Sequence, residues 1–292
     1  MKLETLGSCN LCDSSQIDTI DPECNICRCR SCGYIFPNPR PTLDELISFY
    51  SQPTKYDTWL SEEETRDALW RRRLKKMHRT RKPGNLLDVG TGTGQFLRHA
   101  KPYYTEVCGT EVSESAIEVA RTKYNLNVAK GVIEEIEFGT TFDNISLFHV
   151  LEHVPNPRAT IERCHSLLNS GGILVIAVPN DVLSLRRYVR LFFRKIGVKR
   201  FQDVGAFGMR KIALDGSMNE IHLSLFTPEV LARFLERQGF SVIEQSLDPA
   251  YVTSGAKRLL DDAYFLCHSL LRYALKMNHY DTIWTVAEKR TE

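Results

Sequence analysis

From residue 84 onward, short apolar runs alternate with stretches whose apolar residues recur at helical spacing. Runs of the first kind, at 86–89, 107–112, 127–131, 142–149, 173–179, 240–246 and 281–290, are expected to be strands. Stretches of the second kind, at 95–101, 113–124 and 228–238, are expected to be helices, with caps at Ser113 and Thr227. The alternation predicts an α/β fold with a doubly wound, mostly parallel sheet.

The first 83 residues follow a different pattern. A proline-rich stop at 37–42 separates residues 1–40 from two helical stretches, 43–51 and 61–80, the second of which has its acids first and its bases last. We therefore expect a small module at 1–40, a helical linker or cap at 41–83 and an α/β domain at 84–292. Insertions at about 181–220 and about 254–278 interrupt that domain.

Six of the nine cysteines lie in the first 32 residues. Cys9-x2-Cys12 and Cys29-x2-Cys32 form two knuckles separated by sixteen residues, the spacing of a zinc ribbon. Each knuckle turns two thiolates toward one point, so Cys9, Cys12, Cys29 and Cys32 are the expected ligands of a structural Zn²⁺.

Cys24-x2-Cys27 is a competing knuckle that would enclose a shorter loop. Gly33 and the strand-like Tyr-Ile-Phe segment at 34–36 favour the pair Cys29 and Cys32 as ligands. Cys24 and Cys27 are then spare thiols.

Composition narrows the class further. The chain is 42% hydrophobic and 25% charged with a net charge of +2, which excludes disorder as the main state and gives no global argument for nucleic-acid binding. The N-terminus lacks a signal-peptide pattern, and the longest apolar run, 173–179, is too short to cross a bilayer. A cytoplasmic protein is the expectation.

The candidate chemistry centres on the sequence LLDVGTGTGQFL at 86–97. Gly90, Gly92 and Gly94 allow a close approach of the backbone to a ligand. Gln95 stands where a dinucleotide fingerprint requires its third glycine, so that fingerprint is not matched. Asp88, two residues before the first glycine, would repel phosphate but suits a ligand with an ammonium group.

The hydrophobic-hydrophobic-Asp-x-Gly-x-Gly-x-Gly pattern resembles motif I of class I S-adenosylmethionine-dependent methyltransferases. The resemblance implies a Rossmann-like seven-stranded sheet with an antiparallel strand at its edge. It also implies that the three glycines accommodate the methionine portion of the cofactor and that Asp88 lies beneath them and helps to hold its amino end. The ribbon followed by FPNPRP resembles a bacterial subgroup with an N-terminal four-cysteine ribbon, which often modifies sugars, cell-surface saccharides or secondary metabolites.

The same resemblance assigns the remaining site residues. Glu111 ends the second strand, where an acid grips the ribose hydroxyls, and Glu134 is a partner for the adenine amino group. The segment 142–157 resembles the fourth-strand motif, and His153 and His222 are the candidate catalytic bases. The cofactor-binding set is Asp88, Gly90, Gly92, Gly94, Glu111, Val112, Val132, Ile133 and His149.

The expected activity is methyl transfer to a small-molecule, sugar or cell-surface saccharide or lipid acceptor. One alternative is an RNA methyltransferase that grips its substrate with the ribbon, although residues 1–40 hold five acids and four bases and are not basic. A second alternative is a non-catalytic binding module built on the cofactor fold.

Residues 182–202 carry seven bases and no acid, with apolar residues at helical spacing. Three interpretations remain open for this segment. It is a lid over an anionic substrate, a packed helix with a solvated basic face, or a peripheral membrane contact.

Overall fold

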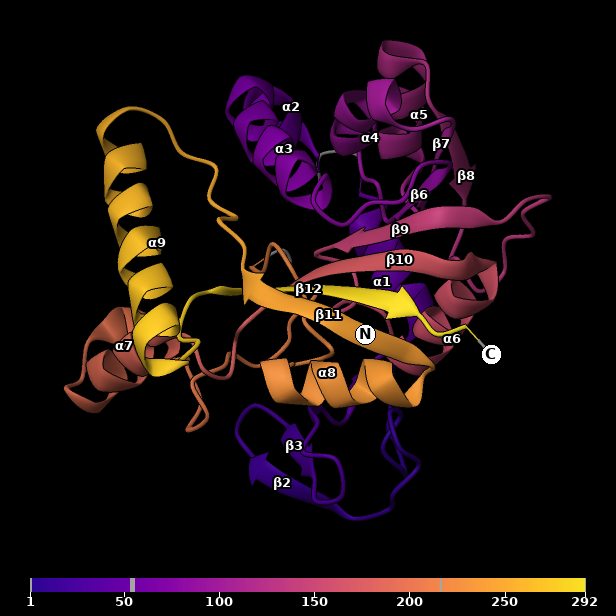
Figure 1. The fold of residues 1–292 in the computed structure, drawn as a ribbon. Helices are drawn as coiled ribbons and strands as arrows, with labels where there is room; N and C mark the ends of the chain where they lie inside the picture. The colour runs from indigo at the N-terminus through magenta and orange to yellow at the C-terminus, as the bar shows by residue number, and fades with distance from the viewer. Residues whose placement is uncertain (1, 53–55, 216, 292) are drawn as a thin grey trace.

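The computed structural model describes residues 2–52, 56–215 and 217–291 (Figure 1). Its centre is a seven-stranded sheet in the order β11-β12-β10-β9-β6-β7-β8, in which β12 alone is antiparallel to its neighbours. The strands are β6 (Leu86–Val89), β7 (Val107–Glu111), β8 (Asn127–Lys130), β9 (Phe142–Phe148), β10 (Leu168–Pro179), β11 (Phe240–Leu247) and β12 (Thr282–Lys289). The prediction of a mostly parallel, Rossmann-like sheet is confirmed.

The position of the last strand differs from the expectation. β12 does not lie at the edge of the sheet but pairs with β10 on one side and β11 on the other, which leaves β11 as the edge strand. The physical reason is burial, because residues 282–287 are buried without alternation and need neighbours on both sides and on both faces.

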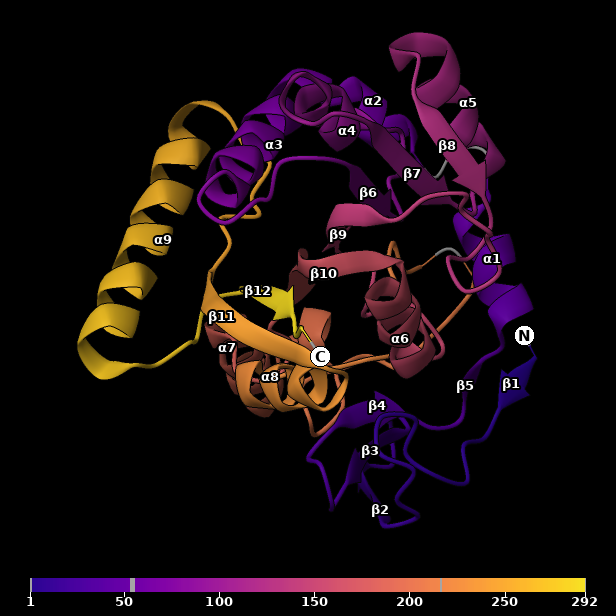
Figure 2. The same ribbon diagram turned by 45° about the vertical axis from the view of Figure 1, so that its right-hand side comes forward.

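Both faces of the sheet are covered, because side chains on the central strands alternate between two cores. Along β10, Leu174 and Ile176 enter the core shared with α6 (Pro157–Leu167) and α8 (Pro228–Arg237). Ile173 and Val175 enter the core shared with α3 (Glu63–Met77), α4 (Gln95–Ala100) and α5 (Glu114–Tyr124). Figure 2 shows α6 and α8 on one side of the sheet and α3, α4 and α5 on the other. The carboxyl ends of the parallel strands therefore meet at one edge, where open α/β sheets bind ligands.

The helices flank this sheet as expected for the most part. The residue before α5, Ser113, occupies the N-cap position without a side-chain capping bond, whereas Thr227 accepts a hydrogen bond from the Val230 amide.

The helices are α1 (Leu43–Tyr50), α2 (Asp57–Ser61), α3 (Glu63–Met77), α4 (Gln95–Ala100), α5 (Glu114–Tyr124), α6 (Pro157–Leu167), α7 (Leu185–Lys195), α8 (Pro228–Arg237) and α9 (Gly255–Leu275), with short 3-10 turns η1 (Lys101–Tyr103) and η2 (Lys199–Phe201).

A buried ion pair fixes α3 to the segment that follows β11. Arg73 donates two hydrogen bonds of 2.9 and 2.6 Å to Oδ2 of Asp248, and both side chains are 1% exposed. The guanidinium also lies 4.9 Å from the ring centroid of Phe148 on β9. Removal of either charged partner would leave the other charge buried and uncompensated.

The N-terminal module is built from short strands. β2 (Ile17–Asp21), β3 (Ile26–Cys29) and β4 (Ile35–Pro37) form an antiparallel sheet, and β1 (Leu3–Glu4) pairs with β5 (Arg40–Pro41). The module packs beneath α8 (Figures 1 and 2), and its Cys9, Tyr34 and Phe36 belong to the same apolar core as Phe226 and Phe234.

Polar contacts bind the module to two loops of the sheet domain. Tyr34 Oη lies 2.6 Å from Oγ of Ser224. Asn10 Nδ2 and an Arg40 guanidinium nitrogen both donate to the carbonyl of Pro155, at 2.8 and 2.6 Å. Both contacted loops carry candidate histidines, because Pro155 is two residues after His153 and Ser224 is two residues after His222.

Within the described residues, no helix has both the length and the apolar character that a membrane crossing requires.

Candidate active site and metal centre

The turn after β6 is a backbone cradle that only glycine can form. Gly90 and Gly92 have φ angles of +65° and +55°, in the left-handed region. A Cβ on Gly90 would lie 2.6 Å from Val150, and one on Gly92 would lie 2.9 Å from the Trp59 ring. Both glycines line a cavity of about 690 Å³ at the carboxyl edge of the sheet.

Gly94 has a different task. It is the N-cap of α4 with a φ of +80°, and a Cβ there would lie 2.6 Å from Leu126 and 3.0 Å from Ala120. Gly94 does not line the cavity. Its lack of a side chain allows the start of α4 to pack closely against Ala120 of α5 and against Leu126.

Glu111 ends β7 and reaches the glycine turn. Its Oε2 accepts the Gly92 amide at 2.8 Å, and its Oε1 accepts the amides of Val112 and Ser113 at 2.8 and 3.0 Å. Burial raises the pKa of this carboxyl, and the three backbone donors oppose that shift. The Tyr56 side chain also hydrogen-bonds to this carboxyl, which lines the cavity together with Val112.

Asp88 lies one layer below. It is 3% exposed, accepts a 2.6 Å hydrogen bond from Ser146 Oγ, and is not part of the cavity lining. Burial raises its pKa to about 7, although the Ser146 hydroxyl favours the ionised form. Asp88 therefore links β6 to β9 directly beneath the glycine turn.

The expected adenine side of the site follows β8. The strand ends at Lys130, and Val132, Ile133 and Glu134 lie in the turn that follows and line the cavity. The hydroxyl of Thr160 on α6 donates a hydrogen bond to Glu134 Oε1. An apolar wall with one carboxylate suits a flat heterocycle that carries an amino group.

His149, directly after β9, also lines the cavity. It has a φ of +57°, an uncommon conformation for a residue with a side chain, and its amide donates to the Ala177 carbonyl at 2.8 Å. Its Nδ1 lies 3.2 Å from Oε1 of Glu152, a carboxylate that is 1% exposed. Burial alone would raise the pKa of Glu152, but the nearby imidazoles lower it, so Glu152 is ionised.

His153 lines the cavity with one nitrogen held by the backbone. Nδ1 lies 2.7 Å from the Ile221 carbonyl, which can only accept, so Nδ1 carries the proton and Nε2 is the basic nitrogen. Nε2 is 3.8 Å from Oε1 of Glu152, and the Tyr50 hydroxyl lies 3.0 Å from Nδ1. Burial lowers the pKa of His153, so the imidazole is neutral at pH 7.

His222 is in a contrasting state. Burial lowers its pKa, but the carboxylate of Asp181, 2.6 Å from Nδ1, outweighs burial and raises the pKa well above its usual value. The His222 ring lies 5.2 Å from the His153 ring, yet His222 is not part of the cavity lining. A histidine that is already protonated can stabilise negative charge but cannot accept a proton.

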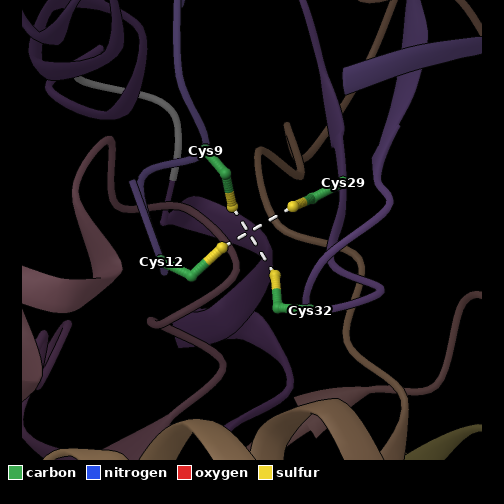
Figure 3. A group of neighbouring side chains, drawn as sticks. All are labelled: Cys9, Cys12, Cys29 and Cys32. Carbon is green, nitrogen blue, oxygen red and sulfur yellow. Dashed lines mark hydrogen bonds between the residues drawn. The ribbon is translucent and has the colours of Figure 1, made fainter. Parts of the chain in front are cut away.

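The four predicted cysteines meet at one point. Figure 3 shows the sulfurs of Cys9, Cys12, Cys29 and Cys32 converging, and the four atoms lie within 4.8 Å of one another. The pairs Cys9–Cys32 and Cys12–Cys29 are 3.6 Å apart, against about 3.8 Å for a tetrahedral zinc with Zn–S bonds of about 2.3 Å. The donor set and geometry therefore fit a structural zinc.

The two remaining N-terminal cysteines lie outside this cluster. Cys24 donates to the Met209 carbonyl at 3.2 Å, and Cys27 lies 3.7 Å from the Thr19 hydroxyl. A second group within the described residues could also hold a cation, because Glu152, His153 and His222 offer ligand atoms within 4.8 Å of one another.

Sequence reasoning missed the residues that cover and orient the site. Tyr50 is the last residue of α1, Tyr56 directly precedes α2, and Trp59 lies within α2. All three line the cavity. Asp181, which sets the charge of His222, and Glu220, which lines the cavity, were not singled out either. Their positions depend on long-range packing, and no local motif marks them.

A glycine turn, a buried acid at the end of the next strand and a partly apolar cavity between them define an enzyme that binds a nucleoside-type cofactor on a Rossmann-like sheet. A family model described as "Methyltransferase domain" matches residues 63–245, more than half of the chain. The chain belongs to that family and is an S-adenosylmethionine-dependent methyltransferase.

Individual proteins with known names are similar to this chain. The ubiquinone biosynthesis O-methyltransferase of Colwellia psychrerythraea is 27% identical over 192 residues, which is 62% of this chain and 72% of that protein. The protein of the same name from Coxiella burnetii is 34% identical over 107 residues. This match covers 46% of that protein, less than half of its length, and 35% of this chain.

Solved structures share the fold. Magnesium protoporphyrin IX methyltransferase from Synechocystis PCC 6803 superposes with a TM-score of 0.54 at 14% sequence identity, covering 85% of this chain and 100% of that one. At this level of identity, the likeness concerns the architecture of the chain.

Proposed function

We propose that this enzyme transfers a methyl group to an oxygen or an acidic carbon of a small acceptor, such as a sugar or a saccharide- or lipid-linked metabolite. The observation that carries the proposal is the single cavity of about 690 Å³ that joins the glycine turn and Glu111 to the neutral His153. A volume in this range suits a cofactor together with a small acceptor.

The expected cofactor fits the residues present. Gly90 and Gly92 leave the space that a Cβ would fill, and Val132 with Ile133 offers an apolar wall. The Glu111 carboxyl reaches the cavity, where we expect ribose hydroxyls to take the place of the Tyr56 side chain as its hydrogen-bond partner. S-adenosylmethionine supplies an electrophilic methyl group on a sulfonium. Asp88 is proposed to act as a positioning residue from beneath the turn, and His149 to lie beside the cofactor.

The protein's own contribution is positioning and proton transfer. Nε2 of His153 is the proposed general base that accepts the proton of an acceptor hydroxyl or carbon acid. Glu152 stabilises the imidazolium that results, because its carboxylate is ionised and 3.8 Å away. Protonated His222 holds Asp181 and is proposed to contribute positive charge near His153 rather than to accept a proton.

A small acceptor is favoured over RNA by the cover on the cavity. The rings of Tyr56 and Trp59 lie over Gly92, 3.6 and 2.9 Å from the position of its missing Cβ. The zinc module packs beneath α8 and holds loops of the sheet domain, so its described contacts are structural.

The test is a labelling experiment with zinc-loaded protein, methyl-labelled S-adenosylmethionine and host lysate. Label in low-molecular-weight or saccharide-lipid fractions, insensitive to ribonuclease and lost with His153→Gln, would support the proposal. Label removed by ribonuclease would establish the RNA enzyme instead. Failure of the intact protein to bind S-adenosylmethionine would favour the non-catalytic binding module.

A further inference from the structure

The exposed apolar side chains of this protein are concentrated on two helices. Among the described residues, 17 large apolar side chains are exposed, and 14 of them lie within 185–198 or 259–277. These segments correspond to α7 with the turn after it and to α9 with the residues after it. Scattered single exposures are normal, but such a concentration marks an interaction surface.

α9 presents a continuous apolar stripe to solvent. Leu259, Leu266, Leu270 and Tyr273 recur at spacings of seven, four and three, which places them on one face of the helix, and they are 59–82% exposed. His268 is the one buried side chain described in this helix. Both views show α9 running along one side of the molecule beyond the edge strand β11 (Figures 1 and 2).

α7 has the same character with added charge. Leu185, Val189, Phe192 and Ile196 follow each other at spacings of four, three and four, and all are exposed. The seven bases of 182–202 include Lys195, Lys199 and Arg200, which have no ion-pair partner among the described residues. No described residue of α7 lines the cofactor cavity, which argues against its role as a lid.

Both helices contact the segment 279–281, which leads from α9 into β12. On the side of α7, the Leu185 amide donates to the His279 carbonyl at 2.9 Å, and the Arg186 guanidinium lies 2.8 Å from the Asp281 carboxylate. From the other side, Phe265 of α9 packs on the Tyr280 ring with centroids 5.3 Å apart. We call the exposed faces of α7 and α9 together the α7–α9 surface.

We propose that the α7–α9 surface docks on a lipid bilayer that carries anionic head groups. Amphipathic helices with an apolar face and basic flanks lie in the interface of such a membrane, with the apolar side chains at the boundary of the acyl chains. The charge favours this occupant over a second copy of the chain, because a two-fold interface across this segment would bring together two copies of a region in which Lys195, Lys199 and Arg200 have no described ion-pair partner.

The acids of α9 do not weaken this match. Asp262 is 3.1 Å from the Arg258 guanidinium and accepts a hydrogen bond from Tyr251, and Asp261 accepts one from Thr253 at 2.7 Å. The Thr253 hydroxyl leaves the charge of Asp261 in place, but the two acids of α9 are outnumbered by its three bases, Lys257, Arg258 and Arg272.

The experiment measures binding of the full-length zinc-loaded protein to vesicles by flotation. Vesicles of phosphatidylcholine alone are compared with vesicles that also contain phosphatidylglycerol. We expect binding to the anionic vesicles that falls as salt is raised, and at least a tenfold loss with the double variant Leu266→Gln, Leu270→Gln or the triple variant Lys195→Glu, Lys199→Glu, Arg200→Glu. Tyr103→Gln, which alters an exposed ring outside this surface, is the matched control.

Binding of S-adenosylmethionine in solution should be unchanged in all these variants, since none of the residues lines the cavity. Absence of vesicle binding, or equal binding to neutral and anionic vesicles, would overturn the proposal. A stable dimer in light scattering that the Leu266→Gln, Leu270→Gln variant dissociates, without vesicle binding by the parent protein, would instead assign the surface to a second copy.

Discussion

Glu111→Gln is the sharpest test of how the cofactor is held. The substitution keeps the shape of the side chain and one oxygen that can accept the amides of Val112 and Ser113. Its new NH₂ group would face the Gly92 amide at 2.8 Å, so two donors would oppose each other at the base of the glycine turn.

The expected loss follows from this geometry. A hydrogen bond to a charged group contributes about 1.5–3 kcal/mol, and the amide forfeits one such bond to the ribose and weakens the other. The dissociation constant for S-adenosylmethionine should therefore rise about ten- to a hundredfold. The unpaired Gly92 amide should in addition cost about 1–3 kcal/mol of folding free energy.

Isothermal titration calorimetry with S-adenosylmethionine measures the first effect, and urea denaturation of the free protein measures the second. Glu135→Gln is the matched control, because Glu135 lines the same cavity but its side chain is exposed. If the folded Glu111→Gln protein bound S-adenosylmethionine within about twofold of the parent, the ribose role of Glu111 would be wrong.

Three further outcomes are expected. His153→Gln should bind S-adenosylmethionine normally but lower kcat by about a hundredfold or more. Because burial lowers the pKa of His153, the parent rate should fall only at a pH below the usual histidine value of about 6.5, and a retained acid limb in the variant would contradict this assignment. Metal analysis should find zinc in the parent protein and in the Cys24→Ser variant but not in the Cys12→Ser variant, and the reverse pattern would reassign the ligands. Asp248→Asn should destabilise the fold by about 3–5 kcal/mol at pH 7 in urea denaturation, because it leaves Arg73 buried and unpaired. Burial raises the pKa of Asp248, but the Arg73 guanidinium outweighs burial and lowers it. The stabilisation from this ion pair is therefore complete above the usual Asp pKa of about 3.9 and is lost as pH falls through the lower pKa of Asp248 in the folded protein. A difference in unfolding free energy between parent and variant that stays unchanged at low pH would refute this.

The sequence predicted what local chemistry encodes. The glycine turn, Glu111 at the end of β7 and the two cysteine knuckles each carry their own spacing, and the structure brings each set together. The roles assigned to these side chains in catalysis and cofactor binding remain predictions.

Other features depend on partners that are far apart in the chain. His153 and His222 were equivalent candidates in the sequence, but Asp181 charges one and burial neutralises the other. The inner position of β12 and the cover formed by α2 likewise depend on packing between distant segments. No pattern within a short window distinguishes such cases.

The attachment of the zinc module has a consequence for how the enzyme can be regulated and divided. Asn10 and Arg40 hold the Pro155 carbonyl, and Tyr34 holds Ser224, so the loops of both histidines rest on a fold that needs its metal. Chelation or zinc starvation should therefore loosen the loop that carries His153 and lines the cavity at Pro155, and methyl transfer should fall without any change to the glycine turn. A catalytic fragment cut free of residues 1–40 would expose Phe226 and Phe234, because the ribbon and the sheet domain share one apolar core.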